Sequence, residues 1–341
     1  MTFLATSREF LAHDATGHPE TAARLRAILD HLDKHPALKG WDRIEPDGPA
    51  TDEELLAVHT RRLLLAVQGA SASAPSWLDP DTYVVEASER CARLAARLTV
   101  QAAQRALDHD EAGLVLVRPP GHHATPDRSM GFCLYNNVAI AAQRMLDAKA
   151  AQRVLVFDHD VHHGNGTQDA FYGSPDVLYQ SFHLGNHYPG TGAADETGTG
   201  AGEGYTMNAP LALGDGEPEV RALMDEVFLP TARAFRPDLV LVSAGYDSLE
   251  GDPLGGLRLT PPFFGEMVQR LLEITPRVVA VLEGGYQLHK IPLAAEWQAR
   301  ALGGERIGAP PGRHAPACLA PLAHALRPQW RILESSVSQW R

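Results

Sequence analysis

The segment Asp158-His159-Asp160-Val161-His162-His163-Gly164-Asn165 holds the residues of this chain that are best suited to chemistry. It follows the apolar run 154–157, which is typical of a buried strand. In extended backbone, Asp158, Asp160 and His162 would project to one side. A carboxylate and an imidazole two residues apart can bind one small cation, as in catalytic zinc sites. The alternative is a capped turn with solvated charges.

Polar motifs follow four apolar runs that are predicted to be strands. They are 118–124 after 114–117, 158–165 after 154–157, 243–248 after 239–242, and 283–286 after 278–282. In open parallel sheets, active sites form beyond the carboxyl ends of the strands. We therefore expect the four motifs to meet at one edge of a sheet.

The residues expected at this edge predict a site for one metal ion with one coordination position left open. Asp160, His162 and Asp247 supply three ligands and leave room for water and substrate, as in catalytic zinc sites. Such a metal lowers the pKa of bound water toward about 7 and polarises a carbonyl oxygen. Taken alone, Asp247 could instead cap the turn that follows it.

Three more side chains can complete the chemistry. The pair His122-His123 offers a general base and a general acid, tuned by nearby carboxylates. Tyr286 can donate a hydrogen bond to a developing oxyanion. Together they predict amide hydrolysis without a covalent intermediate. Taken singly, the histidines could be polar loop residues and the tyrosine a half-buried aromatic. Four other histidines are interpreted as structural or loop residues: His59, His183, His187 and His289.

Hydrophobic periodicity predicts the elements that carry these motifs. Helical segments are expected at 21–33, 53–68, 87–108, 136–148, 217–235, 262–274 and 289–302, and strands at 114–117, 154–157, 177–179, 239–242 and 278–282. Their alternation indicates right-handed βαβ units, and thus an α/β fold with a mostly parallel sheet covered on both faces. We expect a functional loop at 183–205, because this stretch is rich in glycine and lacks periodicity.

Composition narrows the class of protein. The 341 residues are 44% hydrophobic, which supports a sizeable core without disulfides. Three cysteines, no signal-like N-terminus and no long apolar run predict a soluble, cytoplasmic protein without a membrane partner. Cys133 is interpreted as a buried apolar residue. The net charge of −12 disfavours nucleic-acid binding and suits cationic substrates such as lysine-rich peptides or polyamines. Whether the chain forms a homo-oligomer stays open.

The motifs resemble those of the zinc-dependent histone deacetylase family, which has the arginase–deacetylase fold. The likeness spans about residues 10–302 and is most specific at 118–124, 131–133, 136–137, 158–168, 188–192 and 244–247. Residues 163–168 are similar to class II members and their bacterial deacetylase and acetylpolyamine amidohydrolase relatives, whereas class I members typically carry Asp in place of Asn165. The resemblance implies one three-layer αβα domain over 1–341. The pattern after about residue 305 is rich in Pro, His and Ala, and predicts a surface tail at 305–341 with a short helix near 319–326.

The resemblance also implies catalytic roles. One catalytic Zn²⁺ would bind the three ligands named above. His123 matches the general acid–base histidine of the family, and Asn165 would lie behind it. His122 matches the electrostatic partner of that histidine and is backed by Asp158. Tyr286 matches the tyrosine that polarises the substrate carbonyl.

Other positions match the substrate tunnel and two further sites of the family. Phe132 and Tyr188 match the aromatic walls of the acyl-lysine tunnel, beside Gly131 and Leu254. The second wall is commonly Phe, so Tyr188 makes it more polar. Arg24 matches the arginine of an internal acetate-exit cavity. A structural K⁺ is implied at the side chains of Asp158 and Ser181 and the backbone of Asp160, His162 and Phe182.

The substrate is the part that the sequence leaves open. The main hypothesis is an amidohydrolase that removes acetyl or other acyl groups from N-ε-acyl-lysine in proteins or peptides. The alternative is an acetylpolyamine amidohydrolase. Leu254 favours the first, because a polyamine-selective relative has Glu there to bind a second ammonium group. A dinuclear manganese hydrolase would need another carboxylate near Asp247. A scaffold with a dead site would not need every catalytic position to hold a competent side chain.

Overall fold

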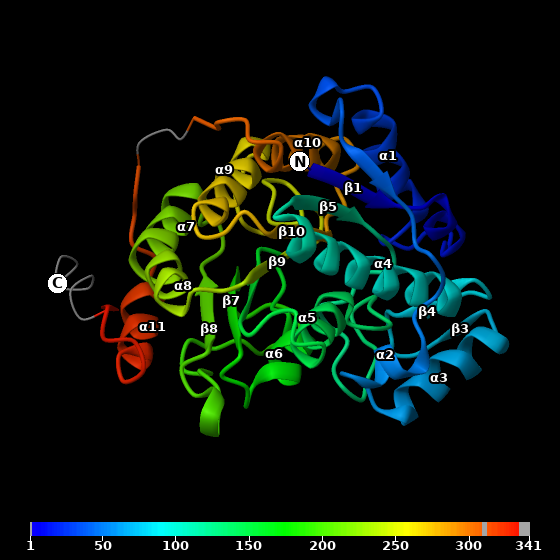
Figure 1. Cartoon of the computed structure of the whole chain (residues 1–341), viewed down its shortest axis with the longest axis horizontal. Helices are drawn as coiled ribbons and strands as arrows, with labels where there is room; N and C mark the ends of the chain where they lie inside the picture. Colours follow the sequence, from blue (N-terminus) through cyan, green and yellow to red (C-terminus); the bar gives the residue numbers. More distant parts are fainter. Residues whose placement is uncertain (1, 309–311, 334–341) are drawn as a thin grey trace.

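The structure is a computed structural model that describes residues 2–308 and 312–333. Its centre is an eight-stranded sheet in which all neighbouring strands are parallel, in the order β2-β1-β5-β10-β9-β6-β7-β8 (Figure 1). The strands are β1 (Thr2–Thr6), β2 (Asp42–Ile44), β5 (Ala112–Leu116), β6 (Val154–Asp158), β7 (Val177–Leu184), β8 (Thr206–Leu211), β9 (Leu239–Ala244) and β10 (Val278–Leu282). A separate antiparallel hairpin pairs β3 (Ser76–Trp77) with β4 (Tyr83–Val84).

Helices cover both faces of the sheet (Figure 1). On one side lie α4 (Ser88–His109) and α5 (Asn137–Asp147), and on the other lie α1 (Ala22–Leu32), α9 (Pro261–Leu272) and α10 (Ile291–Leu302). The remaining helices are α2 (Asp52–Leu56), α3 (Arg61–Ala72), α6 (Asn165–Phe171), α7 (Glu217–Leu223), α8 (Leu229–Phe235) and α11 (Leu319–Leu326). The predicted three-layer αβα class with a parallel sheet is confirmed.

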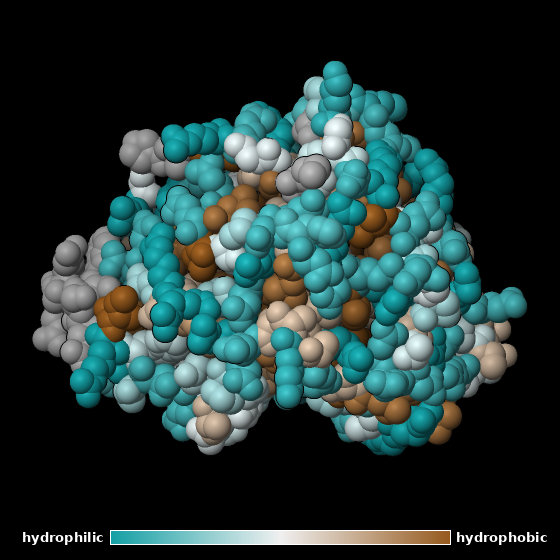
Figure 2. All heavy atoms as spheres, in the orientation of Figure 1, coloured by the Kyte–Doolittle hydropathy of each residue, from teal (hydrophilic) through white to brown (hydrophobic). Residues whose placement is uncertain are grey.

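The four central strands that carry the site could be predicted from the sequence because they are fully buried. Every residue of β5, β6, β9 and β10 is buried. Because helices cover both faces of a parallel sheet, the sequences of its strands are continuous hydrophobic runs. These runs are easily distinguished from the amphipathic pattern of the helices between them. Their side chains belong to one connected core with those of the helices. The face shown in Figure 2 is mostly hydrophilic, with smaller hydrophobic areas between the polar residues.

Several elements differ from the predicted ones. The strands β1, β2 and β8 were not predicted: β2 is a short, partly exposed edge strand, and β8 contains Pro210, which suits an edge but masks a strand pattern. The predicted loop at 183–205 starts later, because β7 extends to Leu184. The predicted helix 53–68 is two helices, since Thr60 caps the start of α3 by accepting the Leu63 N–H.

The C-terminal segment packs into the protein. The predicted short helix is confirmed as α11, which contacts β8 and buries Leu319, Leu322 and Leu326 in the common core. The Trp330 indole N–H donates to the Gly204 carbonyl at 2.7 Å. The predicted surface tail 305–341 is thus anchored by core contacts, and its last residues lie outside the described part. None of the described helices combines the length and apolar character needed to cross a membrane.

Candidate active site

The three predicted metal ligands lie together at the carboxyl edge of the sheet. Asp160 and His162 follow β6, and Asp247 follows the neighbouring strand β9. One ligand atom from each lies within 4.8 Å of the others. His162 Nδ1 is 3.0 Å from Asp160 Oδ1 and 3.3 Å from Asp247 Oδ2. Asp160 and His162 were expected to project to one side from extended backbone. Instead, β6 ends at Asp158, and a bend in the chain brings the two side chains together.

The space between these residues fits a divalent cation. Asp247 Oδ2 is buried and accepts no hydrogen bond from the described residues. A Cβ on Gly284 would lie 2.1 Å from this oxygen, and one on Gly245 would lie 2.0 Å from Asp160 Oδ2. Glycines therefore keep methyl groups out of the space that the carboxylates face. Two carboxylates and one imidazole form the donor set of a catalytic zinc site with an open position.

The tandem histidines are each held by a different partner. His122 Nδ1 lies 3.1 Å from Asp158 Oδ2, which makes this histidine part of an ion pair. His123 Nδ1 lies 2.8 Å from Asn165 Oδ1. Because that amide oxygen can only accept, the His123 nitrogen donates, and Nε2 is left as the proton acceptor. The predicted pairing of these four residues is thus present in the structure.

The surroundings of the two imidazoles shift their pKa values in opposite directions. Burial lowers the pKa of His122, but the carboxylates of Asp160 and Asp158 outweigh this and raise the pKa to about 10. Burial and the positive charges of His122 and His162 hold the pKa of His123 well below its usual value. The protein groups alone therefore favour one protonated and one neutral histidine, a pattern that suits acid–base chemistry.

Glu283 is a part of the site that the sequence did not reveal. Its Oε2 accepts the backbone N–H groups of Gly121 and His122 at 2.6 and 3.1 Å. Burial raises the pKa of this carboxyl group to about 7. Glu283 therefore joins the end of β10 to the histidine loop. The motif 283–286 contained the residue, but nothing in the sequence indicated which loop its side chain reaches.

Arg24 and Gly285 hold the loop that carries Tyr286. The buried Arg24 guanidinium donates to the carbonyls of Gly285 and Glu283, each at 2.6 Å, and lies 4.8 Å from the Tyr286 ring centre. Gly285 has φ +110°, a conformation that L-residues rarely adopt. Burial raises the pKa of the Tyr286 phenol, which stays a hydrogen-bond donor. The predicted acetate-exit role of Arg24 stays a prediction.

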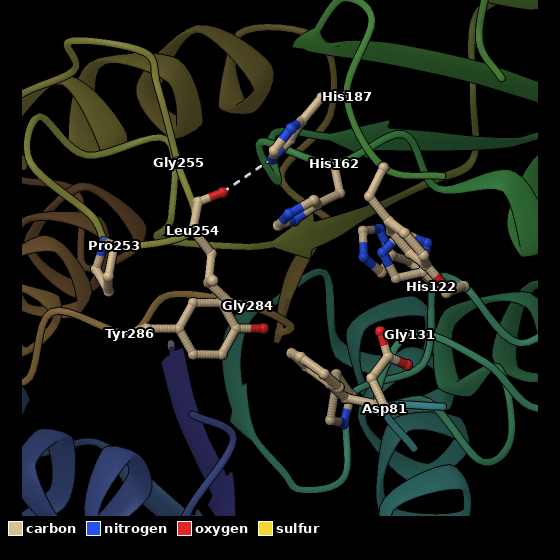
Figure 3. A pocket seen from close by; sticks show the side chains of 14 residues that line it. Asp81, His122, Gly131, His162, His187, Pro253, Leu254, Gly255, Gly284 and Tyr286 are labelled. Atoms are coloured by element: carbon tan, nitrogen blue, oxygen red, sulfur yellow. Dashed lines mark hydrogen bonds between the residues drawn. The ribbon is translucent and has the colours of Figure 1, made fainter. Parts of the chain in front are cut away.

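A cavity of about 280 Å³ lies beside these groups (Figure 3). The predicted tunnel residues Phe132, Tyr188, Leu254 and Gly131 all line it, together with His122, His123, His162 and Tyr286. Phe132 has φ +69°, unusual for an aromatic residue. A Cβ on Gly131 would lie 2.5 Å from His123 Cδ2, so a larger residue would displace the histidine.

Two polar side chains of the cavity wall were not predicted to lie there. Asp81 follows β3, and its carboxylate points toward the cavity in Figure 3. Burial and the neighbouring Asp79 raise the pKa of Asp81 to about 6. His187, interpreted as a structural or loop histidine, does lie in a turn but also lines the cavity. Asp81 follows no predicted strand, so no sequence signal pointed to it. His187 lies in the predicted functional loop 183–205, but nothing in the sequence singled it out from the other residues of that loop.

Comparison with known proteins agrees with this arrangement. The sequence model of the histone deacetylase domain matches residues 18–302. The chain belongs to the histone deacetylase family. Histone deacetylase 15 of Arabidopsis thaliana is 40% identical over 332 residues, covering 96% of this chain and 59% of that protein. Chloroplastic histone deacetylase 10 of Oryza sativa is 37% identical over 318 residues, covering 86% of this chain and 72% of the rice protein.

A solved structure supports the same family assignment. The crystal structure of the HDA15 HD domain superposes with a TM-score of 0.92 at 38% identity, covering 99% of this chain and 97% of that one. The family match includes the strand ends that carry the three candidate metal ligands, the tandem histidines and Tyr286. The chain spans a little over half the length of the Arabidopsis histone deacetylase.

Proposed function

We propose that this chain is a zinc-dependent deacylase that removes acetyl or other acyl groups from N-ε-acyl-lysine in peptides or proteins. One observation carries the proposal: the cluster Asp160, His162 and Asp247 lies beside Tyr286 and two differently tuned histidines along one cavity. Zinc held by the cluster would activate water and polarise the substrate carbonyl. The relatives' names support the reaction class.

The side chains would divide the proton transfers of amide hydrolysis. His123 is neutral and presents Nε2 as a base, because Asn165 occupies its Nδ1. After accepting a proton there, it can donate one to the leaving amine. His122, positively charged beside Asp158, stabilises the negative charge that develops nearby. The Tyr286 hydroxyl donates a hydrogen bond to the carbonyl oxygen as charge develops on it.

The cavity walls favour a linear aliphatic amide. Phe132 and Tyr188 supply aromatic surface, and Leu254 with Pro253 supplies aliphatic surface. Such walls can bury the methylene groups of an acylated lysine and exclude water from the reacting bond. The amide would then reach the histidines and Tyr286 at the polar end of the cavity.

The position of Asp81 supports the alternative function, an acetylpolyamine amidohydrolase. Leu254 offers no charge to a second ammonium group, but the Asp81 carboxylate also lines the cavity. A carboxylate whose pKa is raised by burial and by a neighbouring acid would be stabilised in its charged form by a bound cation. An acetylated diamine could supply that cation within the same molecule.

We also propose the structural K⁺ and a cytoplasmic location. The proposed K⁺ is supported by the pairing of Asp158 with Ser181 across β6 and β7. It is also supported by the carbonyls of Asp160 and His162, which accept no backbone hydrogen bond from the described residues. The proposed cytoplasmic location is supported by the three cysteines, which are all free and buried, as is usual in a reducing compartment.

Turnover of two substrates, combined with metal analysis, tests the proposal. The purified chain should contain one zinc ion, lose activity to a chelator and regain it with zinc. The kcat/KM for an acetyl-lysine peptide should exceed that for acetylputrescine. Asp160→Ala should abolish both zinc binding and turnover. A large preference for acetylputrescine would overturn the acyl-lysine assignment, and activity that survives metal removal would overturn the zinc assignment.

A further inference from the structure

His187 joins two loops that both contribute to the wall of the candidate active-site cavity. Its imidazole stacks on that of the metal-ligand candidate His162, with ring centres 5.0 Å apart and planes at 20°. Its Nε2 lies 3.1 Å from the carbonyl oxygen of Leu254, the dashed contact in Figure 3. Since a carbonyl only accepts, Nε2 carries the hydrogen. The turn after β7 is thus fastened to the loop after β9.

Leu254 is fixed at both of its backbone polar groups. While His187 binds its carbonyl, its own N–H donates to Asp252 Oδ1 at 3.0 Å. Asp252 Oδ2 in turn accepts the backbone N–H groups of Tyr286 and Gln287 at 2.7 and 3.1 Å. A continuous series of contacts therefore runs from His162 through His187, Leu254 and Asp252 to the backbone of Tyr286.

This series of contacts sets the position of the Leu254 side chain. Figure 3 shows that side chain directed into the cavity, between His162 and the Tyr286 ring. The next residue, Gly255, has no side chain to pack, and a Cβ there would lie 2.2 Å from the Asp247 carbonyl oxygen. Two hydrogen bonds, one at its N–H and one at its carbonyl, hold the Leu254 backbone in the wall. Within 2–308 and 312–333, the only donor to its carbonyl is His187.

We infer that His187 is a positioning residue for substrate binding: it holds Leu254 in the cavity wall and so determines how tightly the substrate stem is bound. The inference rests on the proposed deacylase function. His187 is only partly buried, and at the cavity mouth water can replace its bond to the Leu254 carbonyl. Loss of the bond should therefore loosen the wall without unfolding the protein.

Steady-state kinetics on an acetyl-lysine peptide, with the zinc-loaded full chain, tests the inference. His187→Phe keeps a ring over His162 but has no donor, and should raise KM about fivefold while kcat stays within about twofold. His187→Gln restores a donor and should recover part of the KM. His324→Phe makes the same change at an exposed position of α11 and should match the wild type. All melting temperatures should agree within about 2 °C.

A second variant separates positioning from a general effect. If His187 acts through the Leu254 side chain, His187→Phe should change KM less than about twofold in a Leu254→Ala background. An undiminished effect in that background, an unchanged KM in the single variant, or a parallel fall in kcat and melting temperature would each overturn the inference.

Hydrogen exchange keeps the inference testable if the proposed substrate is wrong. A wild-type enzyme that is inactive on acetyl-lysine refutes the proposed function. In that case, faster amide exchange over residues 252–256 in His187→Phe still supports the positioning role, and unchanged exchange overturns it.

Discussion

Replacing Gly284 by Ala adds one methyl group where the carboxylates of the candidate metal ligands converge. An ideal Cβ would lie 2.1 Å from Asp247 Oδ2 and 2.6 Å from Asp160 Oδ2, whereas ordinary van der Waals contact begins near 3.4 Å. The backbone of Gly284 is not in the left-handed region, so the methyl group itself is the obstacle. At least one ligand oxygen must therefore move by about 1 Å.

A shift of this size is large for a metal site. Metal–ligand distances are held to within about 0.2 Å, so a displacement of about 1 Å removes a ligand. Disturbing even a group that only supports a ligand weakens binding by about 10–100-fold. We therefore expect Gly284→Ala to lower zinc affinity by at least about 100-fold and to abolish turnover.

Competition with a chelating dye, zinc quantification after dialysis and far-UV circular dichroism would measure this effect. Gly69→Ala is the matched control, because a Cβ at Gly69 of α3 meets nothing within 4 Å. It should retain wild-type affinity and gain up to about 1 kcal/mol of stability. If folded Gly284→Ala protein bound zinc with wild-type stoichiometry and affinity, the metal could not lie among these three residues.

Three further predictions address the chemistry, the substrate and the pH dependence. Tyr286→Phe should lower kcat about 100-fold with little change in KM, because only the hydroxyl donor is lost; an unchanged kcat on acetyl-lysine peptide would contradict this. Leu254→Glu should raise the kcat/KM ratio of acetylputrescine to acetyl-lysine peptide about fivefold, by giving the second ammonium group a partner; a constant ratio would show that the residue does not contact that end of the substrate. Burial lowers the pKa of His59 to about 4, while its nitrogens bind the Thr125 carbonyl and the Asn136 N–H. Unfolding therefore takes up a proton between about pH 6.5 and 4, and stability falls as pH falls through this range. Urea unfolding of His59→Gln should be less pH-dependent than that of the wild type there.

The sequence predicted the parts of the site that depend on strand ends. Parallel strands place their carboxyl ends at one edge, so Asp160, His162 and Asp247 could be predicted to meet because each follows the end of a predicted strand. The buried runs at β6 and β9 made those strand ends visible. The same logic failed at the sheet margins, where β2 is short and β8 has a mixed pattern, because neither forms a continuous hydrophobic run.

The contacts that support the site could not be predicted in this way. Glu283 reaches the backbone of Gly121 and His122, more than 160 residues away in sequence. His187 binds a carbonyl of the loop after β9, and Arg24 binds two carbonyls after β10. Backbone acceptors exist at every residue, so side-chain identity alone does not say which of them is bound. Local loop geometry decides these partners, and it becomes known only with the three-dimensional structure.

The packing of α11 beside β8 bears on how the edge of the central sheet is protected. As the outermost strand, β8 would otherwise offer unpaired main-chain groups to the same strand of another molecule. Residues 319–333 lie beyond the stretch matched by the family model, yet they shield this margin. Truncation after the matched stretch would thus favour aggregation through β-strand addition, even though every catalytic side chain would remain.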